Sequence, residues 1–161
     1  MDALNQLEWL FRTLGRMHQN ILNQKEIEND LSDASHPIIL FVLRNDMKNM
    51  IASQKEIADE IGISQSTVAI SIKRMEKAGL LKKVQDEDDL RRNLITLTEK
   101  GISYTDKLHR IADEVDRGLF RGFSEEELGI LKNYYSRMID NLEGLGAKVP
   151  VNLSKKCEIK E

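Results

Sequence analysis

Side chains that can contact a polyanion gather in one stretch of this 161-residue chain, between Gly62 and Gln85. The stretch holds five basic residues and one acid, Glu76, although the whole chain has a formal net charge of -3. Its basic residues are Lys73, Arg74, Lys77, Lys82 and Lys83. An acidic protein can carry a nucleic-acid-binding face if one surface collects the positive charge. We therefore expect these side chains to face phosphate groups.

Two short helices are predicted on either side of Gly62. The segment Ser53-Gln54-Lys55-Glu56 matches a capping box, in which serine and glutamate side chains bond to free amides at a helix start. Ser64 can cap a second helix in the same way. We expect helices over 53–61 and 64–78, joined by a tight turn. The buried face of the second helix comprises Val68, Ile72 and Met75, which recur at helical spacing.

The remaining faces of the second helix carry residue types that recognise double-stranded DNA. Gln65 can pair with an adenine edge, and the hydroxyls of Ser66 and Thr67 can bond to phosphate or base. The helix N-terminus itself favours a phosphate. In a helix-turn-helix the second helix enters the major groove while the first crosses the backbone. The contacts predicted in this pair are Ser53, Gln54, Ser64, Gln65, Ser66, Thr67, Ala69, Lys73 and Arg74.

A β-hairpin is predicted directly after the two helices. Leu81–Gln85 and Asn93–Leu97 have the pattern of short strands, and a polar tip lies between them. Arg91 and Arg92 at this tip suit the minor groove, where negative potential is greatest if the groove is narrow. Asp89 is two residues from Arg91, so both can project to the same side and the acid can orient the arginine. Helix, turn, helix, strand, charged tip and strand together indicate a winged helix.

Longer helices are predicted before and after this unit. Apolar residues spaced alternately by three and four indicate a helix over 2–27, and further helices are expected over 98–121 and 124–145. A helix over 36–48 is apolar nearly all round and should be buried. The first and last stripes each need a partner helix. They comprise Leu4, Leu7, Phe11, Leu14, His18 and Ile21, and Leu128, Leu131, Tyr135, Met138, Leu142 and Leu145.

Several motifs resemble those of the multiple-antibiotic-resistance regulator (MarR) family. They are Ile57-Ala58-Asp59-Glu60-Ile61-Gly62-Ile63-Ser64, Ser66-Thr67-Val68, Met75-Glu76-Lys77-Ala78-Gly79-Leu80-Leu81, Asp89-Leu90-Arg91-Arg92 and Leu97-Thr98-Glu99-Lys100-Gly101. The resemblance implies a mainly α-helical homodimer with a small β-hairpin wing. One unit would span 1–146, with the winged helix-turn-helix at 36–97, dimerisation helices at 2–27 and 98–145, and a polar tail at 147–161.

The resemblance also implies a function. Members of the family are usually repressors that bind a roughly palindromic operator, and many release DNA on binding a small organic ligand. The wing arginine and its supporting acid correspond to Arg91 and Asp89. Leu90 replaces a residue that is commonly polar, whereas Lys83 replaces a frequent arginine and can still contact phosphate as a point charge. Candidate pocket residues are Met17, His18, Phe41, Met47 and Leu108, each of which also fits a plain core.

The sequence leaves open two other modes of sensing, by redox chemistry and by a metal, beside a small organic ligand. Cys157, the single cysteine, lies beside Lys155 and Lys156, which lower a thiol pKa and allow a redox role. His18, His36 and His109 are available for a metal, although their spacing is not that of a ligand set. An incidental cysteine and packed histidines are the simpler interpretations.

Two other classes of function are disfavoured. A winged-helix module that binds only proteins would not need Lys73, Arg74 and Arg91. The sequence has no paired nucleophile and base, no glycine-rich phosphate loop and no metal motif, so neither an enzyme nor a bound cofactor is predicted. With one cysteine and no apolar run near the roughly 20 residues of a membrane span, a cytoplasmic protein is expected.

Overall fold

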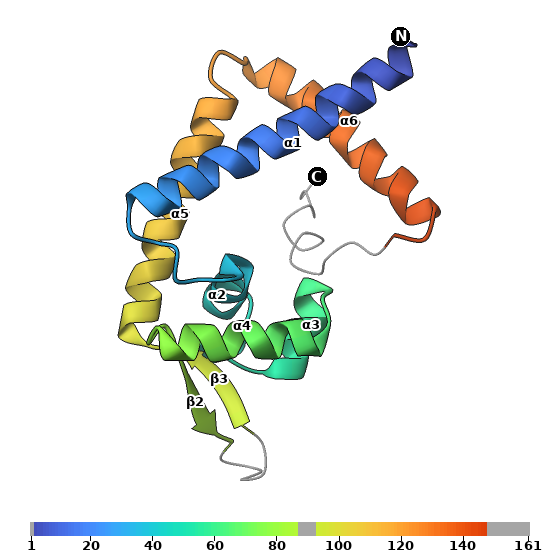
Figure 1. Cartoon of the computed structure of the whole chain (residues 1–161). Helices are drawn as coiled ribbons and strands as arrows, with labels where there is room; N and C mark the ends of the chain where they lie inside the picture. Colours follow the sequence, from blue (N-terminus) through green and yellow to red (C-terminus); the bar gives the residue numbers. More distant parts are fainter. Residues whose placement is uncertain (1, 87–92, 148–161) are drawn as a thin grey trace.

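A computed structural model describes residues 2–86 and 93–147 and shows a mostly helical chain with a small sheet (Figure 1). The predicted fold class is therefore confirmed. The helices are α1 (Ala3–Glu28), α2 (Pro37–Asn45), α3 (Gln54–Ile61), α4 (Gln65–Lys77), α5 (Glu99–Leu119) and α6 (Glu125–Gly144). The strands are β1 (Ile51–Ser53), β2 (Leu81–Gln85) and β3 (Asn93–Leu97), all antiparallel in the order β1-β3-β2.

Local capping determines where α3, α4 and α6 begin. Ser53 and Glu56 form the predicted capping box at α3, and Ser124 and Glu127 form another at α6. At the other end of α3, Gly62 has φ +75°, a left-handed conformation that glycine adopts without a Cβ penalty. This residue lets the chain turn at once into α4.

The segment between α2 and α3 differs from the sequence prediction. The helix expected to reach Lys48 ends at Asn45, and a 3-10 turn (Lys48–Met50) and β1 follow it. Asn49 and Met50 both have positive φ, 57° and 59°, which no α-helix contains. Their backbone turns Ile51–Ser53 so that it pairs with β3. The sheet therefore has a third strand that was not predicted.

The hydrophobic core lies in the half of the molecule that contains α2, α3, α4 and the sheet. The largest fully buried apolar side chains there are Ile39, Leu40, Val42, Leu43, Ile57, Val68, Met75 and Leu80. The N-terminal part of α5 extends this core through Tyr104, Leu108 and Ile111. In Figure 1 this compact half lies below α1, α6 and the far end of α5. The core thus fixes α4 and the hairpin against one end of α5.

By contrast, α1 and α6 contribute no buried residue. Both carry large exposed apolar side chains, including Leu7, Phe11, Met138 and Leu142. Across residues 2–86 and 93–147, none of the helices combines the length and apolar character needed to cross a bilayer.

Candidate nucleic-acid interface

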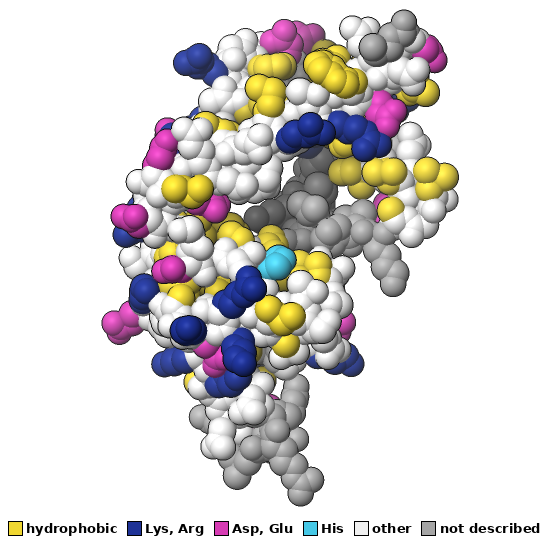
Figure 2. Space-filling view, in the orientation of Figure 1, with side chains coloured by type: hydrophobic (Ala, Val, Ile, Leu, Met, Phe, Trp, Pro, Cys, Tyr) yellow, Lys and Arg dark blue, Asp and Glu magenta, His cyan; other side chains and the backbone are white. Residues whose placement is uncertain are grey.

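The outer face of α4 is exposed and basic. Its inner face, formed by Val68, Ser71, Ile72 and Met75, is buried. At 3.6 residues per turn, the opposite stripe contains Ser66, Ile70, Lys73 and Lys77, all exposed. Figure 2 shows lysine and arginine side chains gathered over the region of α4 and the base of the hairpin. This face has the charge and shape that a DNA groove requires.

The N-terminus of α4 is organised by three hydroxyl groups. Ser64 Oγ accepts the amide of Thr67 at 3.2 Å and lies 2.9 Å from Ser66 Oγ and 2.8 Å from Thr67 Oγ1. The three hydroxyls carry three protons, and the two oxygen–oxygen contacts use two of them. One hydroxyl proton remains for an outside acceptor, together with the first amides of the helix, which have no intrahelical partner. The cluster therefore offers a small anion site rather than three independent contacts.

Gln54 has a structural contact of its own. Its Nε2 donates to the backbone oxygen of Gln65 at 3.0 Å and so ties the start of α3 to the start of α4. This bond helps to set the angle between the two helices. The Gln65 side chain stays exposed at the first turn of α4.

A second clamp holds α4 from its inner side. Ser71, only 2% exposed, lies with its Oγ 2.7 Å from His36 Nδ1, at the start of α2. A buried hydroxyl needs such a partner, because an unpaired one would lose its bonds to water. The sequence pattern suggests for His36 only a helix start or a metal ligand and does not predict this bond.

The predicted contacts in the hairpin are described only in part. Lys83, on β2, is exposed but lies with its Nζ 3.2 Å from Glu76 Oε2 of α4. In the free protein this lysine braces the strand against the helix. Asp89, Arg91 and Arg92, the contacts predicted at the wing tip, lie outside the described residues.

Ile70 is a residue of this face that the sequence analysis missed. Its side chain is 58% exposed although it is large and apolar. Ala69 beside it is half-buried, and Lys73 and Arg74 are exposed. The spacing from Ser66 by four and to Lys73 by three was the signal that could have revealed it.

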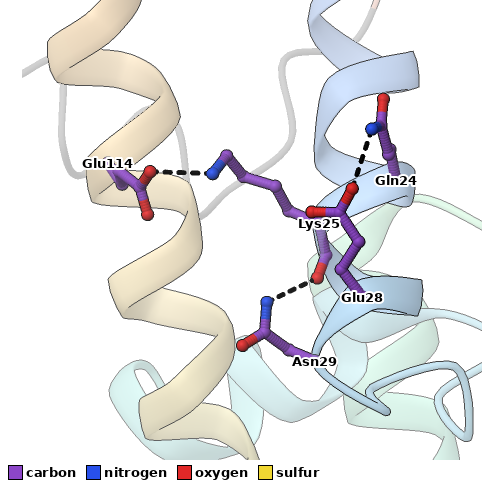
Figure 3. A network of polar contacts seen from close by, with 5 residues as sticks. All are labelled: Gln24, Lys25, Glu28, Asn29 and Glu114. Atoms are coloured by element: carbon purple, nitrogen blue, oxygen red, sulfur yellow. Dashed lines mark hydrogen bonds and ion pairs between the residues drawn. The ribbon is translucent and has the colours of Figure 1, made fainter.

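A groove lies between α1 and α5, with a volume of about 510 Å³. Met17 and His18 line it, and His18 Nε2 is 2.9 Å from Asp116 Oδ1. Lys25 Nζ donates to Glu114 Oε1 at 2.7 Å, which joins α1 to α5 again (Figure 3). The hydrogen bond and the negative charge of Glu114 raise the pKa of Lys25 above its usual value.

The other proposed pocket residues lie elsewhere. Leu108 is buried in the core, and Met47 packs against that core. Phe41 makes an edge-on contact with the ring of His109, with ring centroids 4.5 Å apart. No group of three His, Cys, Asp or Glu side chains able to hold a metal ion occurs within 2–86 and 93–147. Cys157 lies outside the described residues.

The fold and the basic face of α4 define a winged helix-turn-helix DNA-binding protein. The family model described as MarR family matches residues 29–92. SarZ, an HTH-type transcriptional regulator of Staphylococcus haemolyticus, is 28% identical over 116 residues, which cover 71% of this chain and 74% of SarZ. A crystal structure of an S. aureus MepR–DNA complex superposes with a TM-score of 0.71 at 25% identity, covering 83% of this chain and 96% of that one.

Of two further similarities, one is in fold alone and the other covers only part of each chain. A structure of Bordetella bronchiseptica BpsR, whose DNA binding is regulated by 6-hydroxynicotinic acid, shares the fold with a TM-score of 0.68 at 24% identity, covering 87% of this chain and 97% of that one. A riboflavin kinase of Pyrococcus furiosus is 29% identical over 75 residues, 47% of this chain but only 32% of the enzyme. That match leaves most of the kinase without a counterpart here.

The chain is similar to the MarR family of winged-helix regulators, in the segment that the family model matches and in its fold. It is a DNA-binding transcriptional regulator. The sequence prediction of family and function is confirmed at this level.

Proposed function

We propose that the chain acts as a homodimer that binds a palindromic operator, represses transcription and releases DNA when a small organic effector binds. The observation that supports the dimer is the exposure of apolar side chains on α1 and α6. These helices have 26 and 20 residues, and neither has a fully buried side chain within one protomer. Figure 2 shows hydrophobic side chains on the surface in this part of the molecule.

The exposed apolar surface is too extensive for an isolated protomer. Monomeric proteins seldom expose contiguous apolar patches larger than a few hundred Å². The exposed side chains on these two helices include Leu4, Leu7, Leu10, Phe11 and Leu14 of α1, and Leu128, Ile130, Met138, Ile139 and Leu142 of α6. We expect a second copy of the chain to cover them. In this arrangement 2–27 and 98–145 serve dimerisation, and 36–97 serves DNA binding.

A symmetric dimer presents two copies of α4. Each would enter the major groove of one half-site, with the half-sites about 34–36 Å apart. We propose base or phosphate contacts from Gln65, the Ser64 hydroxyl cluster, Lys73 and Arg74, with Arg91 of each wing in the minor groove. Lys83 would leave Glu76 to contact phosphate. We propose that the regulator works in the cytoplasm.

The proposed effector site is the groove between α1 and α5. Its lining is largely apolar, from Leu14, Met17, Ile21 and Val115, and its polar groups are His18, Lys25 and the Glu114 that pairs with Lys25. Such a lining suits a small organic molecule with one acidic or polar group. BpsR shows that a protein of this fold can be regulated by a small acid, although its likeness to this chain is one of fold alone.

Selection of bound duplexes from a random pool tests the DNA part of the proposal. An enriched inverted repeat is the expected result, and affinity should fall steeply with salt as phosphate contacts release counterions. Failure to enrich any motif, with and without cell extract as a source of effector, would contradict it.

Sedimentation equilibrium tests the dimer. Met138→Glu places a charge on the exposed apolar stripe of α6 and should convert the dimer to monomer at micromolar concentration. Asn133→Glu, on the opposite side of the same helix, is the matched control and should leave the mass unchanged. A wild-type mass equal to one protomer would remove the dimer from the proposal.

A further inference from the structure

We infer that Ile70 contacts a thymine methyl group in the major groove and so determines one base of each half-site. This inference rests on the proposed operator binding and specifies a contact within it. Ile70 lies in the middle of the outward stripe of α4, between Ser66 and Lys73, with 58% of its surface exposed. The buried residues Val68, Ile72 and Met75 hold the helix from the opposite side, so this stripe faces away from the core.

The surroundings of Ile70 identify the partner. Lys73, Arg74 and Lys77 on the same side of α4 are all exposed, so an apolar side chain stands among cations. An apolar protein surface would have to desolvate these charges to reach Ile70, whereas DNA supplies phosphates for them. The major groove offers one apolar group at the base edges, the C5-methyl of thymine. DNA with an A·T pair at this position thus provides phosphates for the cations and a methyl group for Ile70.

Helix formation alone does not explain an isoleucine at this position. Isoleucine has a lower helix propensity than alanine, lysine or glutamine, so an exposed position in the middle of α4 gains nothing from it as a helix former. A β-branched side chain in a helix is held almost entirely in one χ1 rotamer. Ile70 therefore loses little freedom when it packs against a methyl group, which makes it a suitable group for recognition.

The test removes the methyl group and the side chain separately. Operators obtained by selection with the wild-type protein are rebuilt with uracil in place of thymine, one symmetric pair of positions at a time, and affinities are measured by fluorescence anisotropy. For the wild type, one pair of positions should show a loss of about fourfold per half-site, the equivalent of one buried methyl group. Ile70→Ala should bind thymine and uracil operators equally at that position.

Lys73→Ala is the matched control, because it removes a phosphate contact from the same stripe. It should weaken binding to all operators and lower the salt dependence, while it keeps the fourfold preference for thymine. The inference is overturned if the wild type binds thymine and uracil equally at every position, or if Ile70→Ala keeps the preference. If selection yields no motif at all, both the proposed operator binding and the Ile70 contact are contradicted. If selection yields an operator whose binding does not depend on thymine methyl groups, only the Ile70 contact is contradicted.

Discussion

Gly101 stands where α5, the hairpin and the end of α4 meet, and its replacement gives the most direct test of this architecture. A Cβ at Gly101 would overlap the backbone oxygen of Leu80 and lie 3.2 Å from Leu97 Cδ2. The Leu80 oxygen accepts hydrogen bonds from Thr98 N at 3.0 Å and Thr98 Oγ1 at 3.2 Å. Gly101→Ala must therefore push α5 away from the Leu80 backbone at the start of β2.

The expected cost follows from two effects. Overpacking a well-filled site costs about 1–3 kcal/mol, and loss of one bond to the Leu80 oxygen costs about 1 kcal/mol more. Gly118, in the same helix, has no atom within 4 Å of its Cβ position. Gly118→Ala should therefore raise stability by about 0.5–1 kcal/mol, because alanine loses less conformational freedom in a helix. The two substitutions should act in opposite directions, and the free energies of unfolding of the two variants should differ by about 2.5–5 kcal/mol.

Urea unfolding of both variants and the wild type measures this difference. All three proteins must be compared at one concentration, since the stability of a dimer depends on it. If Gly101→Ala were as stable as Gly118→Ala, the close approach of α5 to Leu80 would be wrong, and with it the account of how the hairpin is held.

Three further predictions concern the wing, the α6 cap and the clamp behind α4. Arg91→Ala should weaken operator binding by about 1–3 kcal/mol without changing thermal unfolding, and unchanged binding in a mobility-shift titration would remove the wing from the interface. Hydrogen bonding to Ser124 lowers the pKa of Glu127 in the folded protein. The charged carboxylate therefore stabilises the fold at pH values above the usual glutamate pKa. This contribution is lost as the pH falls through the lowered pKa of the folded state. Glu127→Gln should therefore lower the Tm at neutral pH and match the wild type in acid; an equal deficit at every pH would show that the charge is not the cause. Ser71→Ala removes the partner of His36 and should cost about 1 kcal/mol in urea unfolding, whereas unchanged stability would mean that this bond does not hold α4.

The elements that the sequence predicted well are those fixed by neighbouring residues. The capping box at Ser53 occurs as predicted, because serine and a glutamate three residues later satisfy the same helix end, and the same pattern at Ser124 forms a second one. The strands β2 and β3 have the predicted bounds, since β-prone runs flank a polar tip. The exposed stripes of α1 and α6 also follow directly from helical spacing.

Features that depend on distant pairing were missed. The three residues of β1 are too few to show alternation, and their partner β3 lies about 40 residues further on. The bond between His36 and Ser71 joins residues 35 apart, so no local pattern reveals it. Helical periodicity shows which residues share a face of a helix, but it does not show how deeply that face is buried. The sequence therefore predicted buried Leu108 and exposed Met17 in one pocket. Of that set, Met17 and His18 are placed along one groove.

α5 connects the proposed effector groove to the DNA-binding half. Its 21 residues span about 32 Å, with Gly101 packed at one end and Glu114 and Asp116 bound to α1 near the other. A tilt of about 10° about the Gly101 end would move the far end by about 5 Å. In the proposed dimer such a tilt changes the separation of the two α4 helices, which must match half-sites one helical turn apart. The Lys25–Glu114 ion pair and the His18–Asp116 hydrogen bond are partly exposed and individually weak, so a ligand in the groove can displace them at low cost.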